Sequence, residues 1–124
     1  MIHSTERVWH LRLLRRKYNM KIIYNQFIPF PGFTAVNLFG VIFVRKSYEG
    51  NLKDTTIPHE MIHTAQMKEL GYIGFYLIYF LEWIYRLIFH TKSAYRGISF
   101  EQEAYANQGY RNYTDYRKRF AMWR

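Results

Sequence analysis

The sequence predicts an α+β fold in which a small antiparallel sheet or hairpin is followed by helices. Three stretches carry this prediction. Residues 34–45 are rich in Val, Ile and Phe and contain no proline, which favours a strand. Residues 54–58 combine capping side chains with a proline near a first helical turn, and residues 72–89 are apolar on almost every helical face. The 124 residues suffice for one compact domain but not for two separate cores.

The first half of the chain carries the strand signals. Residues 22–30 alternate imperfectly between apolar and polar side chains and run into a Pro/Gly-rich stretch, which predicts a strand and then a turn. The run 34–45 predicts one longer strand, in which Gly40 marks a bulge or a close backbone approach. Residues 46–53 contain Glu49-Gly50-Asn51 and predict a polar loop or hairpin turn.

Two polar helices are expected in the second half. Asp54-Thr55-Thr56 supplies helix-capping chemistry, so a helix should begin close to His59, continue to about Leu70 and stop at Gly71. A later helix should begin near Ser99, with acidic residues in its first turn, and end around Gly109.

Residues 72–89 predict a helix that is apolar nearly all round. Such a helix is buried from all sides, spans a bilayer or lies at a membrane interface. Five aromatic residues that carry an O–H or N–H group, and the charges of Glu82 and Arg86, which can pair at i,i+4, make the segment less lipid-like than a Leu/Val/Ile span. We therefore favour the buried core helix and keep the two membrane interpretations as alternatives.

The net charge of +9 is concentrated at the two ends of the chain. Residues 1–17 and 111–124 each hold five basic residues and one acidic residue, whereas the middle is nearly neutral. The sequence accordingly divides into a basic N-terminal extension (1–19), one domain (20–110) and a basic C-terminal tail (111–124). We interpret the ends as solvated, because no nucleic-acid-binding motif is present; anionic lipid or nucleic acid is the alternative partner.

The chain contains no cysteine, so a metal would have to be held by His and carboxylate side chains. The first residues lack the continuous apolar core of a secretory signal, which makes a cytoplasmic location the default, with membrane association as the alternative. Met20 offers a second plausible translation start.

The segment His59-Glu60-Met61-Ile62-His63 carries the strongest chemical signal. Two histidines four residues apart lie one turn apart on one helix face, so their imidazoles can converge on a single ion. Glu60 follows the first of them and can reach a metal-activated water as a general base.

A catalytic zinc ion needs a third protein ligand, and four glutamates follow His63. Glu69 continues along the same helix and should point elsewhere. Glu82 has Arg86 as a partner for a structural ion pair. Glu101 and Glu103 remain, both in a separate helix that can pack across the first.

The combination of His59-Glu60-x-x-His63 with Glu101-x-x-Ala104 resembles the two-part signature of the gluzincin metallopeptidases. The resemblance implies that Glu101 is the third ligand of a Zn²⁺ ion and that the small Ala104 lets the two helices approach, while Glu103 faces away. It implies a minimal zincin-like domain in which 34–45 is the substrate-binding edge strand. Gluzincins often have Asp where this chain has Tyr105, whose phenol could still hydrogen-bond.

The resemblance therefore predicts a zinc-dependent peptidase that acts on a peptide or protein substrate, with His59, His63 and Glu101 as metal ligands and Glu60 as the catalytic base. An oxyanion-stabilising tyrosine is also expected, and Tyr105 and Tyr110 are nearest in sequence to the ligand helix. The alternative is a catalytically idle zinc-binding or peptide-binding module. Peripheral membrane contact through residues 72–89 and the basic tails is compatible with either.

Overall fold

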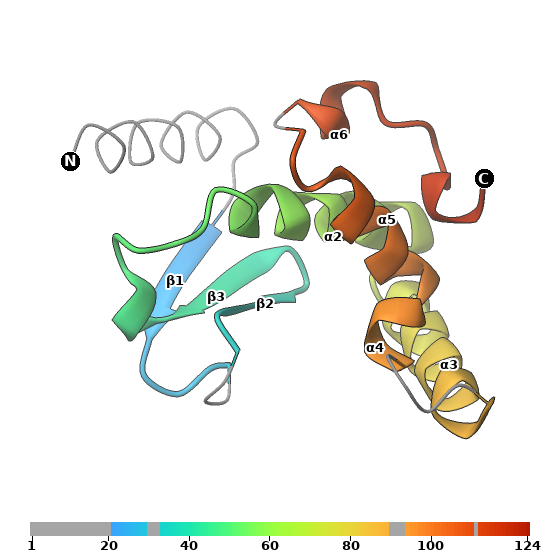
Figure 1. The fold of residues 1–124 in the computed structure, drawn as a ribbon, viewed down its shortest axis with the longest axis horizontal. Helices are drawn as coiled ribbons and strands as arrows, with labels where there is room; N and C mark the ends of the chain where they lie inside the picture. Colours follow the sequence, from blue (N-terminus) through green and yellow to red (C-terminus); the bar gives the residue numbers. More distant parts are fainter. Residues whose placement is uncertain (1–20, 30–32, 90–93, 111) are drawn as a thin grey trace.

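The computed structural model describes residues 21–29, 33–89, 94–110 and 112–124. The predicted α+β class is confirmed, because a three-stranded mixed sheet is followed by helices (Figure 1). The N-terminal extension 1–19 and the turn at Pro31-Gly32 lie outside the described residues. The elements are β1 (Lys21–Asn25), β2 (Ala35–Leu38), β3 (Val41–Arg45), η1 (Lys46–Tyr48), α2 (Thr56–Leu70), α3 (Ile73–Phe89), α4 (Ala94–Gly97), α5 (Ser99–Asn107), α6 (Tyr113–Tyr116) and η2 (Ala121–Trp123).

The sheet has the order β1-β3-β2 and is not wholly antiparallel as predicted. β1 pairs with β3 in parallel, from Lys21 opposite Val41 to Asn25 opposite Arg45, whereas β2 and β3 form an antiparallel hairpin. After β1, the chain crosses to the opposite edge of the sheet and forms β2. It then turns back and forms β3 between the two, so that β3 runs parallel to β1. β2 is therefore an edge strand.

The prediction of one strand over 34–45 was wrong, because the chain reverses at Phe39-Gly40. Both residues have positive φ, 55° and 88°, which is the backbone of a two-residue hairpin turn. Phenylalanine is unusual at such a position, and its ring packs against those of Tyr72 and Tyr76. The Asn37 side chain accepts the Gly40 N–H at 2.9 Å and completes the turn.

α2 lies between the sheet and the helical half of the molecule (Figure 1). Its first half packs on the sheet through a core of Ile22, Ile42, Val44, Leu52, Ile57 and Met61. Its second half joins a separate core of Met67, Phe75, Ile98 and Phe100. Because both cores hold α2, its position relative to β2 and to α5 is set from two sides.

α2 and α3 meet at a sharp corner. The predicted stop at Gly71 is confirmed, since this residue takes the left-handed conformation at φ 69° and caps α2. The helix axes then differ by 110°. Within the described ranges, no single helix has the length and apolar character needed to cross a bilayer; α2 and α3 meet that criterion only as a bent pair.

The prediction of a fully buried α3 was wrong. Phe75 is its one buried residue, and the helix leaves a series of apolar side chains exposed. Glu82 does not pair with Arg86 in this described helix; its carboxylate instead accepts hydrogen bonds from the Ser99 backbone N–H and hydroxyl at 3.0 and 2.6 Å. Glu82 thereby caps the start of α5.

The basic tail is partly built into the fold. The Arg117 side chain is buried and forms ion pairs with Glu69 and Glu103. The expectation of a solvated C-terminal segment is therefore wrong for Arg117, because a partly buried carboxylate on α2 and a buried one on α5 require a cation there. Lys118, Arg119 and Arg124 are exposed.

Candidate metal centre

Two histidines on α2 direct their rings toward one point. His59 and His63 are one helical turn apart, and their Nε2 atoms are separated by 3.1 Å. Both side chains are buried, as expected for a helix that lies between two cores. The predicted convergence of the two imidazoles is thus present in the structure.

Glu101 on α5 meets both rings. Its Oε1 atom lies 3.0 Å from Nε2 of His59 and 3.0 Å from Nε2 of His63. Ala104, one turn further along α5, is fully buried, so α5 can approach α2 closely. His59, His63 and Glu101 form a buried group whose ligand atoms lie close enough together to hold a metal ion.

Each imidazole is oriented by a glutamine on its opposite edge. Nδ1 of His63 lies 2.8 Å from Oε1 of Gln66, and Nδ1 of His59 lies 2.7 Å from Oε1 of Gln108. The Gln66 amide is not ambiguous, because its NH₂ group donates to the Phe100 carbonyl and to Glu103. An amide oxygen only accepts, so each Nδ1 carries a proton, and each Nε2 presents its lone pair inward when its ring is neutral.

This arrangement fits a cation. Two Nε2 lone pairs and a carboxylate oxygen lie 3.0–3.1 Å from one another, and all three are acceptors when the imidazoles are neutral. Such a set is stabilised by a positive ion at its centre. When the ion is absent, a proton on a histidine takes its place: burial lowers the pKa of His63, but the hydrogen bond to Glu101 and its charge raise that pKa to about 9.

The Glu101 carboxylate remains ionised. Burial alone would raise its pKa, but hydrogen bonds from His59, His63 and Tyr79 and the charge of His63 hold that pKa well below its usual range. Tyr79 donates to the other carboxylate oxygen, Oε2, at 2.7 Å. One oxygen of Glu101 is thus fixed by a phenol and the other is left for an ion.

Glu60 is buried beside this group, and Asn37 fixes its backbone. The Asn37 amide donates to the Glu60 carbonyl at 2.9 Å and to the Thr64 hydroxyl at 2.7 Å, which ties β2 to α2. Burial raises the pKa of the Glu60 carboxyl, with the two histidines opposing and Glu101 adding to that effect. The site therefore contains a carboxylate that binds a proton more readily than one in water.

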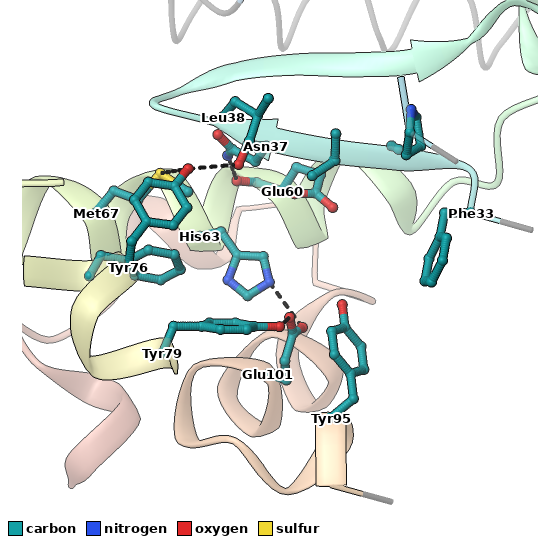
Figure 2. Close-up of a pocket in the computed structure, with 14 residues that line it drawn as sticks. Phe33, Asn37, Leu38, Glu60, His63, Met67, Tyr76, Tyr79, Tyr95 and Glu101 are labelled. Carbon is teal, nitrogen blue, oxygen red and sulfur yellow. Dashed lines mark hydrogen bonds and ion pairs between the residues drawn. The ribbon is translucent and has the colours of Figure 1, made fainter. Parts of the chain in front are cut away.

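A cavity of about 330 Å³ opens between β2, α3 and α4 and reaches these groups. Figure 2 shows His63, Glu60 and Glu101 along its wall, with β2 on one side and the aromatic rings of α3 on the other. Most of the other lining residues are apolar or aromatic: Pro29, Phe33, Ala35, Val36, Leu38, Met67, Phe75, Tyr76, Tyr79 and Tyr95. The polar groups are thus gathered at one part of a largely apolar pocket.

The pocket tyrosines are not those nearest in sequence to the ligand helix. Tyr105 packs its ring on His59, with centroids 4.7 Å apart, and Tyr110 is exposed; neither lines the cavity. Tyr79 and Tyr95 do, and Figure 2 shows the Tyr95 hydroxyl directed into the pocket beside Glu101. Burial, followed by the Glu101 charge, raises the pKa of both phenols, so they stay protonated donors.

Glu103 lies away from the metal-binding group, as the resemblance implies. Its carboxylate accepts hydrogen bonds from Gln66, Tyr113 and Arg117, away from the histidines. Burial raises its pKa, but these three donors and the Arg117 charge lower it overall. Glu103 thus connects the tail to Gln66, which in turn orients His63.

Five residues of the site were not predicted from the sequence: Gln66, Gln108, Asn37, Tyr79 and Tyr95. The positions of Gln66 and Gln108 could have been predicted from helical spacing. Gln66 follows His63 by three residues and Gln108 follows Glu101 by seven, so each lies on the helix face that carries the earlier residue. No local pattern distinguishes Asn37, Tyr79 and Tyr95. They come from a separate strand and two other helices.

No protein-family model, curated protein or solved structure matches the chain.

Proposed function

We propose that this protein is a zinc-dependent peptidase. The observation that carries the proposal is the convergence of His59, His63 and Glu101 on one point, next to Glu60 and in the wall of a pocket. Two imidazole nitrogens and one carboxylate oxygen, with a side open to substrate, are the ligands of many catalytic zinc sites. Glutamine side chains on both Nδ1 atoms support the assignment, since ligating histidines commonly donate their second N–H to an acceptor.

The bound ion would supply Lewis acidity and make a water molecule acidic enough to act as a nucleophile near neutral pH. Glu60 would accept the proton of the attacking water and later deliver it to the leaving amine. Its burial and raised pKa suit this role, because a general base works best when its pKa is not far below the operating pH. Tyr95 would donate its phenolic hydrogen to the carbonyl oxygen as negative charge develops there.

β2 is suited to hold an extended substrate. Arg45 N–H bonds to the Thr34 carbonyl, so in the alternating antiparallel pattern the backbone of Ala35 and Asn37 points away from β3. The Tyr76 hydroxyl donates a hydrogen bond to the Asn37 carbonyl. The backbone N–H and C=O of Ala35 therefore remain to face the pocket side. A peptide could add to this edge as a further strand, with its side chains in the apolar pocket.

The decisive comparison is between the wild type and Glu60→Gln, each loaded with zinc. We expect the variant to retain one zinc ion and to lose hydrolysis of a quenched-fluorescent peptide library by at least about a hundredfold. Tyr95→Phe should also retain zinc and lose about tenfold or more in kcat. Lys68→Gln, on an exposed position of α2, is the matched control and should change neither quantity.

The second candidate is a module that binds zinc and peptide without catalysis. The apolar pocket beside an edge strand would serve such binding equally well. Peptides that bind the zinc-loaded wild type but are cut by neither wild type nor Glu60→Gln would establish this alternative and overturn the peptidase assignment.

A further inference from the structure

α3 carries a continuous apolar surface on the side that faces away from the pocket. At 100° per residue, seven aliphatic or aromatic side chains fall within a sector about 120° wide. We name them the α3 stripe: Ile73, Leu77, Phe80, Leu81, Ile84, Leu87 and Ile88. Six of the seven are 43–75 % exposed, and no charged residue falls in the sector. The stripe is roughly 22 Å long.

The fold gives a reason for this exposure. The opposite face of α3 supplies Phe75, Tyr76 and Tyr79 to the pocket and to the core with Phe100. In Figure 1, α3 extends away from the sheet, with α4 and α5 along one side. Folding of the described residues thus packs one face of an almost wholly apolar helix against the protein and leaves the other face in contact with water.

We propose that the α3 stripe docks on the surface of an anionic lipid bilayer, with α3 lying in the interface plane. Exposed apolar patches of this kind on soluble domains mark an interaction surface. The residues that flank the stripe favour lipid: Trp83 lies on one side and Tyr85 on the other, and both are partly exposed. Rings with a polar edge are the side chains that settle at the level of lipid headgroups.

The net charge of the chain favours a bilayer over a second copy of the chain as the partner that covers the α3 stripe. Two chains of net charge +9 repel one another, whereas the same charge is attracted to anionic headgroups. In the described part of the tail, Lys118, Arg119 and Arg124 are exposed and available for such attraction. Apolar insertion and basic residues together provide the two signals that stable peripheral binding requires.

Docking would bring the pocket close to the membrane. Because the pocket residues and the α3 stripe lie on opposite faces of one helix, the pocket would be held within about one helix diameter, roughly 10 Å, of the lipid surface. The docking proposal itself does not depend on the proposed peptidase activity, and binding can be measured without any substrate.

Vesicle flotation of the full chain tests the proposal. We expect binding to phosphatidylcholine vesicles that contain about one-third phosphatidylserine, and weaker binding to pure phosphatidylcholine. Leu77→Gln/Leu81→Gln should lower the partition coefficient at least about tenfold. Phe27→Gln is the matched control, since Phe27 is 81 % exposed but lies outside α3, and it should bind like the wild type. Circular dichroism and thermal melting establish that each variant is folded.

A second measurement locates the contact. Brominated lipids should quench part of the tryptophan emission in the wild type, and Trp83→Phe should remove that part. The proposal is overturned if the wild type does not float with anionic vesicles. It is also overturned if the double variant binds as well as the wild type, since the tails alone would then suffice. A wild-type dimer that the double variant dissociates in the absence of lipid would assign the stripe to a second copy instead.

Discussion

Oε1 of Gln108 accepts a hydrogen bond from Nδ1 of His59 at 2.7 Å. This contact orients the His59 ring, for which the sequence suggested the phenol of Tyr105. Gln108 is the residue directly after α5. It follows Glu101 by seven residues, about two helical turns, and therefore lies on the same side of the helix axis. Tyr105, one turn after Glu101, packs its ring on the imidazole. The same face therefore supplies a carboxylate, an aromatic contact and an acceptor to one pair of histidines.

Gln108→Ala should weaken metal binding without abolishing it. Loss of the Nδ1 acceptor frees the His59 ring to rotate and removes its preferred tautomer, which commonly costs 10- to 100-fold in metal affinity. Competition with a zinc chelator measures the effect. Gln102→Ala, at an exposed position of α5, should leave the affinity unchanged. Equal affinity of Gln108→Ala and wild type would show that this contact does not orient a ligand.

Glu101→Ala and Glu103→Ala should have opposite phenotypes. Glu101→Ala should lose stoichiometric zinc, because it removes the oxygen shared by the two histidines. Glu103→Ala should retain zinc but be destabilised by about 3 kcal/mol, since it leaves Arg117 buried beside a single carboxylate. Metal analysis and urea unfolding measure the two properties. Loss of zinc from Glu103→Ala alone would refute the assignment of Glu101.

Zinc should stabilise the fold, because the site is assembled from α2 and α5 and exists only in the folded chain. At a free zinc concentration about 100 times the Kd, the free energy of unfolding should rise by about 2.7 kcal/mol. Thermal melting with added zinc or with EDTA measures this shift. The Glu101→Ala protein should show no such shift, and a shift of equal size in that variant would indicate binding elsewhere.

The stability of the metal-free protein should fall in acid partly through Glu103. Its pKa is lowered in the folded state, so its contribution is present above the usual carboxyl pKa of about 4.3 and is lost as pH falls toward the folded value. Urea unfolding in EDTA should therefore show a steeper decline below about pH 4.5 for the wild type than for Glu103→Gln. Parallel declines for the two proteins would contradict this role.

Local patterns in the sequence were sufficient for much of the helical half. The glycine after Leu70 and the spacing of the two histidines are properties of one helix, and the structure reproduces both. The helix begins at Thr56, three residues before the predicted start, and Thr55 at its N-cap makes no side-chain capping hydrogen bond. The helix-face separation of Glu101 and Glu103 follows from the same geometry. The hairpin in 34–45 was missed because Phe39 lacks the Asn or Asp signal of such a turn. Its positive φ is accompanied by contacts with Tyr72, in the corner between α2 and α3, and with Tyr76 on α3.

The sequence by itself therefore determined the α+β class, the α2 helix and the set of residues from which a metal site could be built. Only the tertiary structure decided that Glu101 meets both histidines, that Gln66 and Gln108 orient them and that one face of α3 remains exposed. The physical reason is the separation along the sequence of the residues that interact. Helical periodicity and capping depend on neighbours a few residues apart. The contacts of Glu101 with the two histidines and of Gln108 with His59 instead join residues 38 to 49 positions apart, and they depend on how two cores hold α2 between them.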